Sequence, residues 1–165
     1  MAVNILLVDD DISTISVILD GVDWKKIGIE NVYVAHNIMT AKKKFSEFKV
    51  DIVVCDIEMP MGSGIDFLKY LREKGSVVPF VILTNYGRFE LAQAAIEYKV
   101  HSYLLKPLNL DKLENELLSI IHDLSIEHNM QMFDDENNYL VSSFWSDLLH
   151  NAICVRQRHF LFSMN

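Results

Sequence analysis

A set of polar side chains stands directly after short apolar runs at four places in the chain. Its members are Asp9, Asp10, Asp11, Asp56, Glu58, Thr84, Asn85 and Lys106, and Pro107 follows the lysine. Crowded carboxylates repel one another and need a cation, and ligands that are all oxygen favour Mg²⁺. A lysine and a threonine can bind phosphoryl oxygens. A carboxylate beside the metal can act as a nucleophile and become an acyl phosphate, so the set predicts phosphoryl chemistry.

The apolar runs before these residues predict strands. The runs are Val3–Val8, Val32–Ala35, Ile52–Cys55, Phe80–Leu83 and Tyr103–Leu105. They are rich in branched residues and short, which is typical of strands buried on both faces of a parallel sheet. The carboxyl ends of parallel strands meet at one edge, where ligands bind in open α/β sheets. We therefore expect the polar set to converge there.

Apolar residues at helical spacing separate the strands and predict five helices. They are Ile15, Ile18 and Leu19, then Ile38, Ala41, Phe45 and Phe48, then Phe67, Leu68 and Leu71, then Phe89, Ala92 and Ile96, and finally Leu110, Leu113, Leu117, Ile121 and Leu124. Gly21 and Gly75 are expected to end the first and third helices in the left-handed conformation. Asn37 and Asn109 are expected to cap helix starts. The alternation predicts an α/β fold, a doubly wound parallel sheet of five strands with helices on both faces.

The pattern changes near His128. Residues 129–138 are polar and acidic, and a further amphipathic helix is expected from the apolar residues Leu140, Val141, Phe144, Trp145, Leu148, Leu149 and Ala152. This helix has no complete core of its own. We therefore expect one domain over residues 1–127 and a linker with a helical extension over 128–165, which docks on another surface.

Composition excludes several functions. The net charge of -8 argues against direct binding of nucleic acid by this chain. No long uncharged apolar run or basic leader occurs, so a soluble, cytoplasmic protein with no membrane contact is expected. Cys55 and Cys154 follow no metal-ligand or redox spacing, which favours a reducing compartment and structural roles. The six histidines share no spacing that suggests zinc.

Each member of the polar set also has an ordinary structural explanation. Aspartates after a strand often cap the next helix, and we expect Asp11 to do only that. A single threonine or a Lys-Pro step is common loop chemistry. The conjunction of suitable groups at four strand ends favours one shared site.

At these residues the chain resembles the receiver domain of two-component response regulators, a CheY-like family, over about residues 3 to 125. The matching segments are Ile-Leu-Leu-Val-Asp-Asp-Asp at 5 to 11, Asp-Ile-Val-Val-Cys-Asp-Ile-Glu-Met-Pro at 51 to 60, Val-Ile-Leu-Thr at 81 to 84 and Tyr-Leu-Leu-Lys-Pro at 103 to 107. The resemblance implies a flavodoxin-like strand order of 2-1-3-4-5. It also implies a signalling switch rather than an enzyme with turnover.

The resemblance assigns roles to the individual residues. Asp56 would accept the phosphoryl group, and Thr84 and Lys106 would contact it. Asp10, Asp56 and the main-chain carbonyl of Glu58 would bind Mg²⁺, with Asp9 assisting through water. Thr84 and Tyr103 would be the switch residues, and Lys106-Pro107 would be a cis peptide. The donor implied is a sensor histidine kinase, and phosphorylation would alter the face of helix 4, strand 5 and helix 5 and favour a homodimer.

Three further segments resemble regulators of the YesN type, which carry an AraC-type DNA-binding domain after a helical linker. They are Val-Asp-Trp-Lys-Lys-Ile-Gly-Ile at 22 to 29, Asn-Tyr-Gly-Arg-Phe-Glu-Leu-Ala-Gln-Ala-Ala-Ile at 85 to 96 and Phe-Trp-Ser-Asp-Leu-Leu at 144 to 149. No basic recognition helix is present, so this resemblance implies a chain truncated before its DNA-binding domain.

Four residues depart from the family pattern. Asn85 stands where a small residue is usual, and it would narrow access or add an amide contact to the phosphoryl group. Glu58 adds a carboxylate side chain beside the acceptor, which would slow phosphorylation by repulsion, orient water or bind metal. Ile38 and Lys99 stand where glycine is frequent, and Lys99 in a left-handed helix end would cost about 1 kcal/mol.

Two alternative functions are left open. A phosphate-independent pseudo-receiver would keep the fold without the switch, and Glu58 and Asn85 are its best support. A haloacid-dehalogenase-like phosphatase also forms an aspartyl phosphate after a strand. That class has Asp-x-Asp at the nucleophile, whereas this chain has Asp56-Ile57-Glu58.

Overall fold

A parallel sheet forms the centre of the protein in a computed structural model that describes residues 2–60, 62–85 and 97–130. Its strands are β1 (Val3–Val8), β2 (Ile29–Ala35), β3 (Ile52–Asp56), β6 (Phe80–Thr84) and β7 (Ser102–Leu105), in the order β2-β1-β3-β6-β7. Because β6 and β7 are the fourth and fifth strands of this sheet, the expected order 2-1-3-4-5 is confirmed. A small antiparallel pair, β4 (Glu58–Met59) and β5 (Gly62–Ser63), follows β3.

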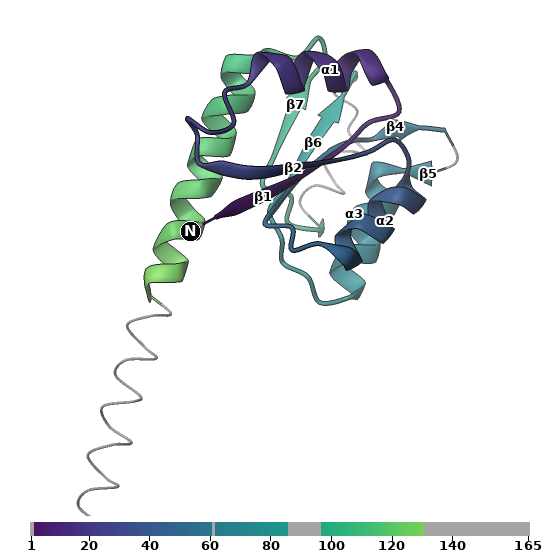
Figure 1. Cartoon of the computed structure of the whole chain (residues 1–165). Helices are drawn as coiled ribbons and strands as arrows, with labels where there is room; N and C mark the ends of the chain where they lie inside the picture. Colours follow the sequence, from purple (N-terminus) through teal and green to yellow (C-terminus); the bar gives the residue numbers. More distant parts are fainter. Residues whose placement is uncertain (1, 61, 86–96, 131–165) are drawn as a thin grey trace, which may run out of the picture. The chain divides into compact units, whose positions relative to one another are not determined.

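Helices cover both faces of the sheet, as predicted. They are α1 (Ile12–Gly21), α2 (Ile38–Glu47), α3 (Gly64–Glu73) and a helix over residues 110–130. Figure 1 shows α2 and α3 on one face, and α1 with residues 110–122 on the other. The predicted fourth helix, from Phe89 to Ile96, lies outside the described residues, which resume at the helical residue 97.

The core follows the two-residue period of the strands. One core cluster joins strand residues to α2 and α3, and it includes Leu6, Val8, Val53, Cys55, Phe80, Ile82, Ala41, Phe67, Leu68 and Leu71. Alternate strand residues, among them Ile5, Leu7, Ile52 and Val54, are buried as well. Each such side chain contributes roughly 1.5–3 kcal/mol when it is fully buried. The continuous apolar runs are therefore explained by burial on both faces.

Strand β2 begins three residues earlier than predicted, at Ile29 rather than Val32. Ile29 is buried and pairs with Val3, but the exposed Glu30 and Asn31 interrupt the apolar pattern. The register of the β1–β2 pair also shifts between Val3 and Asn4. Because of this irregularity, the alternation of apolar and polar residues does not indicate where β2 begins.

The capping predictions are confirmed at three of four positions. Gly75 has φ 76 after α3, Asn37 accepts a hydrogen bond from the Thr40 amide at 2.8 Å, and Asn109 accepts one from the Lys112 amide at 3.0 Å. The prediction for Gly21 was wrong, because Gly21 is the last residue of α1 and the cap is Val22 in an extended conformation. A Cβ atom on Gly21 would overlap the Leu110 side chain, so close packing is the reason for a glycine there.

Residues 1–122 form a compact unit, and a second unit begins at residue 123, inside the 110–130 helix. The expected boundary between residues 127 and 128 stays a prediction. The amphipathic helix expected from Leu140 to Ala152 lies outside the described residues, as does Cys154. Within the described ranges, no helix has the length and apolar character required to cross a membrane.

Arg72 on α3 joins the segment before β6 to the turn before β7. Its guanidinium donates to the main-chain carbonyls of Ser76, Val78, Tyr98 and Lys99 at 2.9 to 3.4 Å. Burial lowers the pKa of the Arg72 guanidinium from its ordinary value. The turn itself is strained, since Lys99 has φ 50, the left-handed conformation that its sequence position predicted.

Replacing Lys99 with glycine is expected to stabilise the protein. Lys99→Gly removes the steric cost of the left-handed conformation and should raise the free energy of unfolding by about 0.5–1 kcal/mol, measured by urea denaturation. The matched control is Lys74→Gly at the end of α3, where φ is -79 and glycine only adds flexibility. A gain in the control equal to the gain at Lys99 would contradict the explanation.

Candidate functional site

Three carboxylates meet where β1 and β3 end. Asp9 and Asp56 are buried, Asp10 is exposed, and one oxygen of each lies within 4.8 Å of the others. The register explains the meeting, because Val8 pairs with Cys55 in the sheet and the following residue of each strand carries a carboxylate. The structure therefore brings together the acidic residues that the strand ends predicted.

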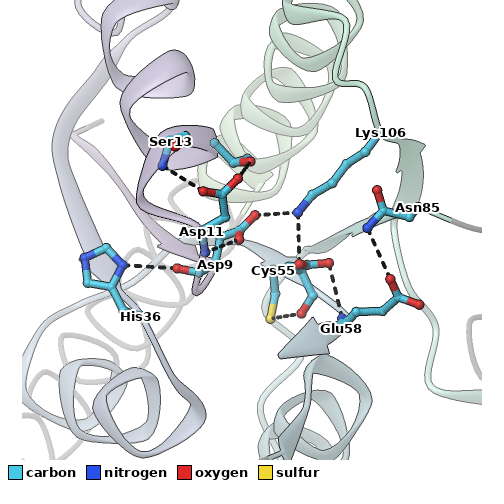
Figure 2. Close-up of polar contacts among 10 residues, drawn as sticks. Asp9, Asp11, Ser13, His36, Cys55, Glu58, Asn85 and Lys106 are labelled. Atoms are coloured by element: carbon cyan, nitrogen blue, oxygen red, sulfur yellow. Dashed lines mark hydrogen bonds and ion pairs between the residues drawn. The ribbon is translucent and has the colours of Figure 1, made fainter. Parts of the chain in front are cut away.

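Lys106 joins two of these carboxylates. Its Nζ atom lies 2.8 Å from Asp9 Oδ2 and 2.9 Å from Asp56 Oδ2, and its side chain is only 12% exposed. Figure 2 shows the lysine extended from the end of β7 toward Asp9. Burial tends to lower the pKa of the Lys106 ammonium, but hydrogen bonds to Asp9 and Asp56 outweigh it and raise the pKa above its ordinary value.

Asp9 is held by main-chain groups as well as by Lys106. The Asp11 amide donates to Asp9 Oδ1 at 2.9 Å, and the Asp9 amide donates to the Ala35 carbonyl at 3.1 Å. Burial raises the pKa of the Asp9 carboxyl from its ordinary value, and the hydrogen bond from Lys106 opposes that rise. Asp9 is therefore a fixed carboxylate whose charge is costly in the folded protein.

The surroundings of Asp56 leave little room for movement. The Glu58 amide donates to Asp56 Oδ1 at 3.2 Å, and the Cys55 thiol donates to the Asp56 carbonyl at 3.1 Å. A Cβ atom on Gly64 would overlap the Asp56 carbonyl oxygen, so the start of α3 can approach β3 only with glycine at that position. Burial raises the pKa of the Cys55 thiol well above its ordinary value, so Cys55 stays a neutral, structural thiol.

Thr84 and Tyr103 lie on neighbouring strands with opposite exposure. Thr84 is buried at the end of β6, and its carbonyl accepts a hydrogen bond from the Lys106 amide at 2.8 Å. Tyr103 on β7 is 60% exposed. The Lys106-Pro107 peptide is cis, as the resemblance implied. The main chain thus links the predicted phosphoryl-binding lysine directly to the predicted switch threonine.

Asp11 has the structural role that was expected for it. Its side chain accepts from the Ser13 amide at 2.9 Å and from the Thr14 hydroxyl at 2.7 Å, at the start of α1. The Thr14 and Ser13 hydrogen bonds lower the pKa of the Asp11 carboxyl. Asp11 is thus a helix cap and not part of the carboxylate group.

Two contacts beside the site were not predicted from the sequence. Asn85 Nδ2 donates to Glu58 Oε2 at 3.1 Å, and His36 Nδ1 lies 3.1 Å from the Asp9 carbonyl oxygen (Figure 2). The strand register of the structure accounts for the first contact. Asp56 pairs with Leu83, and the two contacting residues stand two positions further along each chain segment.

Residues 5–118 match the family model described as the response regulator receiver domain. The match covers more than half of the chain, and it includes the acidic residues, Thr84 and Lys106. The chain belongs to this receiver-domain family. The family membership agrees with the sheet order and with the position of the carboxylates at its carboxyl edge.

Relatives of this receiver domain include transcriptional regulatory proteins. YesN of Bacillus subtilis, itself named as uncharacterized, is 34% identical over 125 residues, which are 73% of this chain and 33% of YesN. ZraR of Klebsiella oxytoca is 36% identical over 115 residues, which are 68% of this chain and 25% of ZraR. The chain thus spans about a third of one relative and a quarter of the other.

Solved structures show the same fold. The receiver domain of AraT, a response regulator from Geobacillus stearothermophilus, is 29% identical to this chain with a TM-score of 0.70. The similarity covers 78% of this chain and 99% of the AraT domain. The predicted fold and family are therefore both confirmed.

Removing the Asp9 charge from the receiver domain is expected to stabilise the fold. Because the folded-state pKa is raised, the charged carboxylate costs free energy at neutral pH, and the cost disappears as pH falls below the unfolded-state pKa near 4. Asp9→Asn should therefore raise the free energy of unfolding at pH 7. Urea denaturation should show the two proteins converging toward about pH 4, and a difference independent of pH would contradict this.

Removing the Lys106 cation is expected to have the opposite effect. Lys106→Met leaves the buried Asp9 and Asp56 carboxylates without their shared cation and should lower the free energy of unfolding by roughly 3–5 kcal/mol at pH 7. The loss should shrink in acid as Asp9, whose pKa is raised by burial, becomes protonated. The control is Lys43→Met, which removes an exposed ion pair with Glu47 and should change stability by less than about 1 kcal/mol.

Proposed function

We propose that this receiver domain is a phosphoacceptor switch in which Asp56 accepts a phosphoryl group from a sensor histidine kinase. The observation that carries the proposal is the Lys106 ammonium bonded to both Asp9 and Asp56 at the carboxyl edge of the sheet. A cation in this position can bind a phosphoryl oxygen once Asp56 is modified. Family membership and the relatives named as transcriptional regulators support the proposal.

The three carboxylates suit a Mg²⁺ ion. Their oxygens lie within 4.8 Å of one another, and the donor set is entirely oxygen, which is the chemistry that Mg²⁺ prefers. We propose that Asp10, Asp56 and the Glu58 main-chain carbonyl bind the ion and that Asp9 contributes through water. When bound, the ion neutralises charge on the phosphoryl oxygens and on the crowded carboxylates.

The proposed transfer uses groups that the chain already positions. A carboxylate oxygen of Asp56 attacks phosphorus in the phosphohistidine, the P–N bond breaks, and the imidazole nitrogen keeps the electron pair and takes a proton from solvent. Lys106 Nζ then donates to a phosphoryl oxygen in place of Asp56 Oδ2, and Thr84 provides a hydroxyl at the adjacent strand end. Hydrolysis by water releases inorganic phosphate and restores the carboxylate, so the chain catalyses only its own modification.

The proposed response is a shift between two conformations. Thr84 would move toward the phosphoryl group and Tyr103, now largely exposed, would turn inward and reshape the surface around β7. We propose that this change drives homodimerisation or a transcriptional output in the cytoplasm. DNA binding would come from an AraC-type domain outside this chain.

The proposal predicts modification of one residue. With Mg²⁺ and acetyl phosphate, intact-mass spectrometry should show one added phosphoryl group, and Asp56→Asn or removal of Mg²⁺ should abolish it. The control is Asp20→Asn, an exposed carboxylate on α1 that should leave the modification unchanged.

Two other results would point to the alternatives. A wild-type protein that keeps its fold but takes no phosphoryl group would contradict the switch and support a phosphate-independent module. Sustained hydrolysis of phosphate esters would support the haloacid-dehalogenase-like phosphatase, which family membership disfavours.

A further inference from the structure

A side-chain hydrogen bond joins the two residues beside the acceptor that depart from the family pattern. Asn85 Nδ2 donates to Glu58 Oε2 at 3.1 Å, and both side chains are exposed. Figure 2 shows the pair next to Lys106, on the side away from Asp9 and Asp11. The bond links the segment after β3 to the segment after β6.

The pair lies close to Asp56 for a reason of register. Asp56 pairs with Leu83 in the sheet, and Glu58 and Asn85 come two residues later in their respective segments. The two oxygens of Asp56 have different partners, since Oδ1 accepts from the Glu58 amide at 3.2 Å and Oδ2 accepts from Lys106 at 2.9 Å. Glu58 thus contacts Asp56 through its main-chain amide and Asn85 through its side chain, so the segment that binds Oδ1 also carries the bond to Asn85.

Charge favours a rearrangement of this bond when Asp56 is phosphorylated. The Glu58 side chain carries a further negative charge two residues after Asp56, in addition to the group of Asp9, Asp10 and Asp56. A phosphoryl group brings about -1.5 to -2 charges and three strong acceptor oxygens into their neighbourhood, and like charges so close repel. The neutral Asn85 amide has no such repulsion. It can donate equally well to a phosphoryl oxygen.

Exchange of the Glu58–Asn85 hydrogen bond for another also costs little free energy. An exposed hydrogen bond contributes little to stability, because water replaces either partner readily. The backbone need not unfold for a terminal amide to change acceptor, since the side-chain torsions suffice. The exposed Glu58–Asn85 hydrogen bond is thus suited to be a contact that changes when Asp56 is phosphorylated.

We propose that Asn85 positions the phosphoryl group on Asp56, and that Glu58 binds the Asn85 amide until Asp56 is phosphorylated. In unmodified protein the amide binds Glu58 Oε2. After phosphorylation of Asp56 the amide donates to a phosphoryl oxygen, which holds the group on Lys106 and Thr84 and slows its hydrolysis. This inference rests on the proposed function, because it requires Asp56 to be the acceptor.

The test is a double-mutant cycle on the lifetime of the acyl phosphate. The wild-type chain, Asn85→Ala, Glu58→Ala and the double variant are phosphorylated with acetyl phosphate and Mg²⁺, the donor is removed, and loss of the phosphoryl mass is followed. Both side chains are exposed, so the variants are expected to fold. Asn85→Ala should shorten the lifetime several-fold in wild type and on the order of tenfold in the Glu58→Ala background, where the amide no longer has a competing acceptor.

Matched controls separate this effect from a general loss of surface contacts. Asn31→Ala breaks another exposed side-chain hydrogen bond, from Asn31 Nδ2 to Asn4 Oδ1 at 2.8 Å, and Glu30→Ala removes an exposed carboxylate of the same strand. Neither should change the lifetime. In parallel, the ¹⁵N side-chain resonance of Asn85 should shift when beryllofluoride, a phosphoryl mimic, binds with Mg²⁺, and the Asn31 resonance should not.

Three results would overturn the inference in different ways. An unchanged lifetime in both backgrounds would show that the amide does not contact the phosphoryl group. An effect of Asn85→Ala that vanishes in the Glu58→Ala background would show that Asn85 only restrains Glu58. Absence of phosphorylation in every variant would instead remove the proposed function, and this inference with it.

Discussion

The attraction between one buried ammonium and two buried carboxylates is the interaction on which this structure depends. Backbone pairing of β1 with β3 brings Asp9 and Asp56 together whatever their charge, so the sheet creates a repulsion that it cannot relieve by itself. Lys106 relieves it from β7, which is separated from β3 by the whole of β6. Only a long side chain starting at the carboxyl edge can span that distance. The sheet order and the position of Lys106 therefore together determine how the charges of the site are balanced.

The same balance connects stability with function. A cluster of carboxylates with a single cation is less stable than an apolar packing of similar volume. It is also ready to bind further positive charge, and its lysine can be shared with a new anion. The raised pKa of Asp9, caused first by burial, is the measurable sign of that cost. Features that weaken the fold here are the ones that the proposed chemistry would use.

Much of this arrangement could be predicted from the sequence, because strand ends in a parallel sheet are determined by short apolar runs. Asp9, Asp56 and Lys106 were placed together by that argument, and the structure brings them within hydrogen-bond distance. Contacts between distant segments were harder to predict. The packing of Gly21 against Leu110, the close approach of Gly64 to Asp56 and the Glu58–Asn85 bond depend on tertiary distances that no local period contains.

The contacts of Arg72 have a consequence for how this fold can vary in evolution. Among the described residues, its guanidinium donates only to main-chain oxygens, at Ser76, Val78, Tyr98 and Lys99. Every amino acid supplies the same carbonyl, so those four positions can mutate without losing the contact, whereas the planar fork of Arg72 has no equivalent. A structural dependence of this kind produces no covarying pair of residues. Methods that infer proximity from correlated substitutions would therefore miss one of the firmest links between α3 and the turn before β7.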